Sequence, residues 1–266
     1  MGTEVQWREA DYPSPVGLGL GIGCVFVVQM VVIAYFYVYR RFCSPPLIQP
    51  TEDKFTAQPY SFLKGMFEHL GQVEGFVLLG GYLALTWMLN LLPASYYVMD
   101  SGGVEWHLVL LQLLLQDLLQ YGAHFLEHKV SSAFYRASHK PHHRFTNPRM
   151  FDAFNGSIAD TVCMILMPLF ITAHLVHCNT WSYMAFGSSY AGLLTLIHAE
   201  YCHPWDRVFR LIGVGTAADH HVHHKLFVFN YGHTFMYWDR LFGTYKRPED
   251  VRTFRWRVEA DKAKTS

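Results

Sequence analysis

The chain has 266 residues, of which 51% are hydrophobic and 16% aromatic, and its 21 Lys and Arg balance its 21 Asp and Glu. This neutral balance gives no electrostatic case for binding nucleic acid. The apolar residues lie in long runs instead of at amphipathic spacing, a pattern typical of chains that cross a lipid bilayer. The composition therefore indicates an integral membrane protein.

Five apolar runs follow one another along the chain, and we expect them to form membrane-spanning helices: 16–39, 75–99, 105–121, 157–176 and 181–198. The first two contain no charged residue, and each is longer than the roughly 20 residues that span a bilayer. The third is interrupted by Asp117 and the fourth by Asp160. The sequence thus predicts an all-α bundle of four to five spans, which forms a single membrane domain over residues 1–266.

Basic residues mark one end of this predicted bundle. They gather in the loops at that end: Arg40, Arg41, Lys54, Lys64, Lys129, Arg136, Lys140, Arg144 and Arg149. The opposite loops, 100–104 and 177–180, contain no Lys or Arg, so the positive-inside rule places the basic end in the cytosol and the amino terminus on the lumenal or external side. Lys262 and Lys264 have the spacing of a dilysine retrieval signal, so we expect a multi-pass protein of the endoplasmic reticulum membrane.

Histidines cluster at this cytosolic end. His124 and His128 are four residues apart, which places both imidazoles on one helical face. Two further clusters repeat the pattern H-x-x-H-H, and one more histidine ends the fifth run; these are His139, His142 and His143, then His220, His223 and His224, and finally His198. One structural metal takes about four ligands, so nine candidate ligands indicate a two-metal centre in a cytosolic, histidine-rich cap.

The ligand type bears on the metal, because imidazole suits both zinc and iron. A hydrolytic zinc pair would more often recruit carboxylates, and the close acidic residues are only Glu127, Glu200 and Asp219. We therefore favour iron, and a redox-active pair must receive its electrons from outside because the chain shows no flavin fingerprint. The other interpretation is a histidine-rich metal transporter, but transport is expected to need ionisable ligands within the spans.

A polar stripe follows the third run, where every fourth residue is polar: Gln112, Gln116, Gln120, His124 and His128. The stripe either lines a path from the bilayer to the metals or serves only for hydrogen bonding between helices. Other polar residues near the candidate ligands either orient a ligand imidazole or lie at the surface. The candidates for such an orienting role are Asp117, Gln120, His203, Asp219, His221 and His233.

Four sequence motifs resemble those of a known family. They are A-S-H-K-P-H-H at 137–143, G-T-A-A-D-H-H-V-H-H at 215–224, N-Y-G at 230–232 and W-D-R-L-F-G-T-Y at 238–245. The order of the histidine motifs resembles that of the fatty acid hydroxylase/sterol desaturase superfamily of membrane non-haem di-iron enzymes, over about residues 120–248. The resemblance implies two Fe ions held by the nine histidines, O2 as co-substrate, and cytochrome b5 with its NADH-dependent reductase as electron donors.

Within the superfamily the sequence is most similar to sterol C5-desaturases, which share the H-K-P-H-H, H-x-V-H-H and N-Y-G motifs followed by W-D-R. The resemblance implies a sterol desaturase of the endoplasmic reticulum, with a fatty acyl or sphingoid hydroxylase that uses the same centre as the alternative. The chain departs from the desaturase pattern at 148–156, which lacks a histidine-containing segment, and at 201–206. These two segments are candidates for shaping the substrate cavity.

Overall fold

The computed structural model describes residues 13–50, 61–100, 102–256, 258–259 and 263. Within these ranges the chain consists of helices and loops, with two isolated bridges and no strand. The all-α class predicted from the sequence is confirmed. The predicted dilysine signal, Lys262 and Lys264, and the basic residue Lys54 lie outside the described residues.

Two helical stretches of the described chain are long and apolar enough to cross a membrane, judged by length and composition. The first is α1 (Pro15–Phe42), where the Ser14 side chain accepts a hydrogen bond from the backbone N–H of Val16 and Pro15 occupies the first turn. Its 28 residues extend for about 42 Å. The second is Ile158–Leu175, which joins α6 (Ile158–Thr161), the π-turn η6 (Val162–Leu166) and α7 (Met167–Leu175).

The other three predicted runs are also helical, with different bounds. Run 105–121 lies within α4 (Trp106–Lys129), and run 181–198 matches α8 (Thr180–Leu196). Run 75–99 is helical only through η2 (Val73–Val77) and α3 (Leu78–Met88). The chain then leaves the helix because Asn90 adopts a φ of 54° and Pro93 cannot continue it, before the short turn η3 (Ala94–Tyr97). The number of spans therefore stays a prediction.

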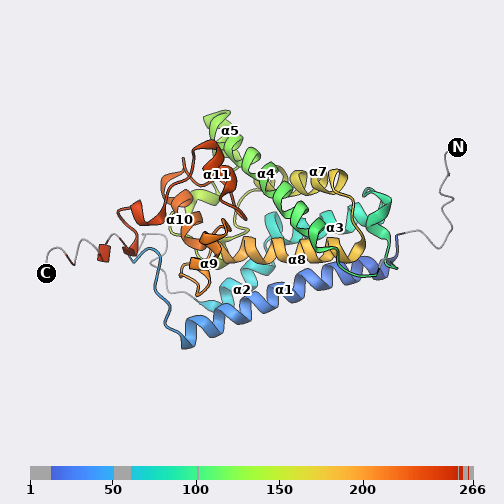
Figure 1. The fold of residues 1–266 in the computed structure, drawn as a ribbon, viewed down its shortest axis with the longest axis horizontal. Coiled ribbons are helices and arrows are strands. Elements are labelled where there is room, and N and C mark those ends of the chain that lie inside the picture. The colour runs from blue at the N-terminus through green and yellow to red at the C-terminus, as the bar shows by residue number, and fades with distance from the viewer. Residues whose placement is uncertain (1–12, 51–60, 101, 257, 260–262, 264–266) are drawn as a thin grey trace.

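The long helices pack side by side around α8. In Figure 1, α8 lies along α1, and α8 also contacts α4, which in turn packs on α7. A buried apolar cluster fills the space between these helices and includes Leu79 of α3, Ile165 of η6, and Phe186, Tyr190 and Leu194 of α8. Side chains from α3, α4, η6, α7 and α8 therefore hold this part of the bundle together.

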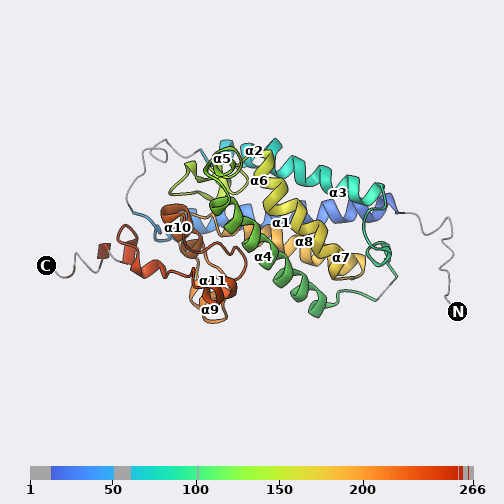
Figure 2. The same cartoon turned by 90° about the horizontal axis from the view of Figure 1, so that it is seen from above.

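Shorter helices form a cap at the C-terminal ends of α1, α4 and α8, visible on the left of Figures 1 and 2. They are α2 (Phe62–Leu70), α5 (Ser132–Ala137), η4 (His142–Arg144), η5 (Met150–Asp152), α9 (Asp206–Leu211), α10 (Ala217–Leu226), α11 (Tyr237–Phe242) and η7 (Pro248–Asp250). A second buried cluster ties the cap to the bundle, because Phe36 of α1 packs with Met150, Val222 and Phe254. All nine candidate ligands lie in the cap or at helix ends that enter it.

Candidate metal centre

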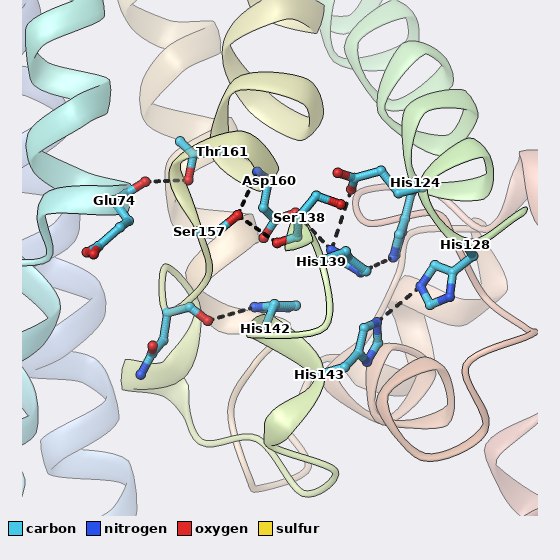
Figure 3. A network of polar contacts seen from close by, with 12 residues as sticks. Glu74, His124, His128, Ser138, His139, His142, His143, Ser157, Asp160 and Thr161 are labelled. Carbon is cyan, nitrogen blue, oxygen red and sulfur yellow. Dashed lines mark hydrogen bonds and ion pairs between the residues drawn. The ribbon is translucent and has the colours of Figure 1, made fainter. Parts of the chain in front are cut away.

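The nine predicted ligand histidines gather into two neighbouring groups. Within each group, one ring nitrogen from every member lies within 4.8 Å of the others. The first group contains His124, His128, His139, His143 and His223, and the second contains His142, His198, His220 and His224. All are buried except His128, which is partly buried. Figure 3 shows four members of the first group with His142 beside them.

Each H-x-x-H-H motif supplies both groups. In the first motif His139 and His143 belong to one group, whereas His142 in the turn η4 belongs to the other. In α10, His220 and His224 are one helical turn apart and share the second group, and His223 turns to the first. The two groups therefore share the same chain segments, and the rings of His143 and His224 are centred 4.8 Å apart.

Within each group the Nε2 atoms face one another. In the first group the separations are 2.9 Å for His124–His139, 3.2 Å for His128–His143 and 2.9 Å for His143–His223. In the second group they are 3.4 Å for His142–His198, 3.0 Å for His198–His220 and 3.0 Å for His220–His224. A metal–imidazole bond of about 2.1 Å separates two adjacent nitrogens on one ion by about 2.9–3.4 Å. The spacing fits nitrogens that share an ion.

The opposite ring nitrogens show which way the imidazoles are protonated. In six of the nine histidines the Nδ1 atom lies against an oxygen that can only accept: the Tyr231 carbonyl is 2.8 Å from His124, and Asp160 Oδ1 is 2.8 Å from His139. Carbonyl oxygens of Asn155, Leu194, Phe229 and Phe145 serve His142, His198, His223 and His224 in the same way. A proton on Nδ1 leaves the Nε2 lone pair free. The inward-facing Nε2 atoms of these six histidines are thus electron-pair donors.

Burial favours the neutral form of several of these rings. Desolvation lowers the pKa of His142 to about 4. Desolvation, with the neighbouring imidazoles, also lowers the pKa values of His143, His220 and His224 well below 6.5. A neutral imidazole is the form that binds metal. The donor set therefore fits two transition-metal ions, with iron among the metals that imidazole suits.

Two carboxylates lie beside His139, and the sequence did not single out either as a site residue. Asp160 Oδ1 hydrogen-bonds to His139 Nδ1, and Glu127 Oε2 lies 3.6 Å from the same nitrogen. Ser157 helps to place Asp160, because its hydroxyl accepts a hydrogen bond from the Asp160 backbone N–H (Figure 3). The available signal was the lone acidic residue in the apolar run 157–176.

A buried carboxylate on α4 holds the loop that follows α10. Asp117 accepts hydrogen bonds from the backbone N–H groups of His233, Thr234 and Phe235 at 3.1, 2.6 and 3.1 Å. Gln120, one turn further along, accepts from the Tyr190 hydroxyl at 3.0 Å. Asp117 and the stripe residue Gln120 are thus both satisfied by hydrogen bonds within the protein.

The N-Y-G and W-D-R motifs meet in the same loop. Asp239 accepts hydrogen bonds from the backbone N–H groups of Tyr231 and Gly232, both at 2.8 Å. Only glycine fits at position 232, because a Cβ there would lie 2.4 Å from the Phe235 carbonyl oxygen. The loop thereby presents the Tyr231 carbonyl to His124. The N-Y-G and W-D-R motifs thus orient the candidate ligand His124 through its Nδ1 atom, on the side of the ring away from the histidine group.

The remaining predicted orienting residues divide into two kinds. Asp219 accepts from the Thr216 hydroxyl at 2.6 Å and fixes the start of α10, and His221 lies 3.0 Å from the Ala199 carbonyl beside the second group. His233 is also at the centre, with its ring 5.0 Å from those of His124 and His220. His203 instead contacts the Tyr35 hydroxyl and stacks on Trp205.

Two cavities lie along the bundle. A small one touches the histidines and is lined by His139, His142, His198, His233, Gln120 and Asp160 together with apolar side chains. A larger, mostly apolar one lies between α1, α3 and α8. Phe154, Ile165 and Leu194 line both cavities. The arrangement therefore places apolar space beside a group of metal-binding side chains.

Comparison with known proteins identifies the family. The fatty acid hydroxylase family model matches residues 109–244, just over half of the chain. The chain is 57% identical over 252 residues to an alternative squalene epoxidase from Phaeodactylum tricornutum, covering 92% of this chain and 71% of that protein. It is 31% identical to methylsterol monooxygenase 1 from Danio rerio, with 80% and 75% covered.

It is also 26% identical to a Delta(7)-sterol 5(6)-desaturase from Gibberella zeae, over 92% of this chain and 74% of that protein. No solved structure matches the chain. The residues matched by the family model contain all nine histidines of the two groups. The chain therefore belongs to the fatty acid hydroxylase/sterol desaturase superfamily and is an oxidoreductase.

Proposed function

We propose that the protein is a membrane-bound, di-iron squalene epoxidase that uses O2. The observation that carries the proposal is an apolar cavity ending beside the two histidine groups, in a chain 57% identical over 92% of its length to a protein named alternative squalene epoxidase. The sterol C5-desaturase function expected from the sequence has weaker support, at 26% identity to the desaturase from Gibberella zeae. Acyl or sphingoid hydroxylation ranks lower, because the relatives named above carry the names of squalene- or sterol-modifying enzymes.

One iron would be held by the first histidine group and the other by the second. When bound, the pair supplies the activation of O2 needed to add one oxygen atom across a carbon–carbon double bond. The other oxygen atom leaves as water, so the reaction consumes two electrons and two protons. We expect cytochrome b5 and its NADH-dependent reductase to supply the electrons.

The chain's own residues prepare the site for this chemistry. The Tyr231 carbonyl and the Asp160 carboxylate fix the protons of His124 and His139 on Nδ1, so that both Nε2 atoms face inward. Phe154, Ile165 and Leu194 exclude water from the boundary between the two cavities. A dry, preorganised site favours oxidation of the substrate over side reactions with water.

The proposed setting is the endoplasmic reticulum membrane, with the histidine cap in the cytosol. Support comes from the two helices long enough to span and from the basic residues at the cap end of α1, Arg40 and Arg41. The same end of α4 carries Lys129. Basic residues flank cytosolic ends of spans, where the soluble electron-donor domains would also lie.

The decisive experiment is complementation of yeast that lacks its own squalene epoxidase. The yeast expresses this protein and is grown under 18O2. We expect growth and 2,3-oxidosqualene that carries one labelled oxygen, detected by gas chromatography with mass spectrometry. His143→Ala should abolish the product, whereas His177→Ala, an exposed histidine outside both groups, should not. A parallel assay in C5-desaturase-deficient yeast reads ring-B diene absorbance; diene without oxidosqualene would replace the epoxidase proposal with the desaturase.

A further inference from the structure

The larger cavity has a closed end far from the histidines. Atoms leave about 780 Å³ unfilled within its outline, a figure that includes space open to the surroundings. At one end the Trp87 ring packs against Gly17 so closely that a Cβ on Gly17 would lie 2.4 Å from ring atom Cζ2. The Trp87 indole N–H also donates to the Ser14 carbonyl at 2.9 Å. Trp87 therefore forms a fixed floor.

The other end of the cavity meets the histidine pocket. Phe154, Ile165 and Leu194 line both spaces and form the partition between them. Along α8 the lining runs from Thr180 near the floor to Leu194 at the partition. These fourteen helical steps correspond to about 21 Å. An extended squalene chain is longer than this, so a chain that reaches the floor would extend past the partition.

The walls offer almost no free hydrogen-bonding group to a ligand. The Thr86 hydroxyl donates to the Tyr82 carbonyl, the Thr180 hydroxyl to the Tyr96 carbonyl, and the Tyr190 hydroxyl to Gln120. Among the described lining residues, the Tyr183 hydroxyl is the exception, since it has no hydrogen-bond partner. Such a wall suits a hydrocarbon better than a ligand with several polar groups.

The cavity also has a side opening. Ile22 of α1 lines it and is 39% exposed, and Leu18 of α1 and Leu83 of α3 line it and are partly exposed. An apolar ligand dissolved in the bilayer could thus enter between α1 and α3. The opening faces lipid if α1 spans the membrane as proposed.

We propose that this cavity is a tube that binds an acyclic hydrocarbon and whose length determines which part of the hydrocarbon reaches the histidine pocket. The Trp87 floor stops one end of the chain, and the partition of Phe154, Ile165 and Leu194 admits only the other end to the histidine pocket. The position of the floor then selects the terminal double bond for oxidation. This inference rests on the proposed function for its substrate, squalene, and adds the residues that set where the substrate reacts.

Glycines on the walls allow a direct test. Gly21 lines the cavity, and a Cβ there would have no atom within 4 Å, so Gly21→Leu should fill the tube without displacing a neighbour. Gly19→Leu is the matched control, because Gly19 lies two residues away on the same helix, is exposed and is not part of the lining. Gly187→Leu fills the tube from α8 on the opposite wall, where the nearest atom would be 3.9 Å away.

The readout is binding of tritiated squalene to detergent-purified full-length protein stripped of metal, which does not depend on turnover. We expect Gly21→Leu and Gly187→Leu each to weaken binding at least tenfold, with Gly19→Leu unchanged. Circular dichroism identifies any variant that fails to fold, and the other filling variant then decides. Equal squalene binding by a folded filling variant and Gly19→Leu would overturn the inference.

Tyr183→Phe and tritiated cholesterol separate this inference from the proposed function. A hydrocarbon occupant predicts unchanged squalene binding in Tyr183→Phe and weaker binding of cholesterol than of squalene. Tighter cholesterol binding that Tyr183→Phe weakens would instead identify a hydroxylated sterol as the occupant and overturn the inference. The two proposals can also fail separately. If both filling variants lose squalene binding but the wild-type protein forms no oxidosqualene, the cavity still binds the hydrocarbon and only the epoxidase proposal fails.

Discussion

The Nε2 atoms of His124 and His139 face each other at 2.9 Å while both Nδ1 atoms are held by acceptors, the Tyr231 carbonyl and the Asp160 carboxylate. With both protons on Nδ1, two lone pairs would point at one another inside the protein. A cation bound by both nitrogens removes this repulsion, whereas a direct hydrogen bond between them would need an extra proton. The pair is therefore arranged for a metal ion instead of for mutual hydrogen bonding.

The first prediction concerns the metal content of the protein. Purified protein should contain about two irons per chain, because each histidine group offers at least four nitrogen donors. His143→Ala should lower the iron content, measured by plasma mass spectrometry, since His143 contacts both His128 and His223 in the first group. The control His177→Ala should retain both irons, and full iron retention by His143→Ala would contradict the assignment.

Replacement of Asp160 tests the support for one ligand. In Asp160→Asn the side chain keeps its size but loses its negative charge, so the N–H of His139 is held less firmly. Loss of such an outer hydrogen-bond partner typically weakens metal affinity about 10- to 100-fold. Competition with an iron chelator measures the change. Asp250→Asn, at an exposed ion pair with Arg247, is the control, and an equal affinity for both variants would show that Asp160 has no such role.

Eight of the nine histidines could be found from the sequence because helical spacing and repeated H-x-x-H-H patterns are local properties, and His198 could be found from its place at the end of an apolar run. Their division into two groups could not, because it depends on how the turn at His142 aims one ring at His198 while its neighbours face His124 and His128. The support from Asp160 was missed for the same reason: its partner His139 is 21 residues away. The helix in run 75–99 ends early because Asn90 adopts a positive φ, and the hydropathy of the run gives no sign of that conformation.

Asp117 should be essential for stability of the loop at the centre. Asp117→Ala leaves three backbone N–H groups without their acceptor, at a cost of about 1–3 kcal/mol for each buried group. Asp117→Asn keeps one acceptor oxygen and should lose less. Thermal unfolding in detergent should therefore rank the proteins wild type, Asn and Ala from most to least stable. Identical midpoints for Ala and wild type would mean that water replaces the carboxylate.

A buried histidine outside the centre should make the metal-free protein acid-sensitive. Burial lowers the pKa of His69 in α2 to about 4, against an ordinary value of 6.5. Between these pH values the unfolded state binds a proton that the folded state does not, so stability falls as the pH falls from about 6.5 to 4. His69→Phe removes this contribution, and Phe suits a site beside Phe76, Phe151 and Phe154.

The measurement is the unfolding midpoint of both metal-free proteins across this pH range. The ligand histidines titrate in both proteins, so the difference between them isolates His69. We expect the midpoint of His69→Phe relative to wild type to rise as the pH falls from 6.5 to 4. A constant difference would mean that His69 binds protons equally in the folded and unfolded states.

Trp87 should set how far the terminal double bond of the substrate reaches into the histidine pocket. Trp87→Leu lowers the floor of the cavity by removing part of an indole that packs on Gly17, so the substrate can slide deeper and withdraw its terminal double bond from the histidine pocket. Every internal double bond moves away from the pocket as well, so the yield of 2,3-oxidosqualene should fall at least several-fold without the appearance of internal epoxides, as measured by gas chromatography with mass spectrometry. Trp106→Leu is the matched control, because Trp106 is 68% exposed at the start of α4 and is not part of the lining. Removal of buried aromatic volume costs stability, up to about 3–5 kcal/mol for truncation to Ala, so yields are compared at equal amounts of folded protein. An unchanged yield of 2,3-oxidosqualene in folded Trp87→Leu would show that the floor does not position the substrate.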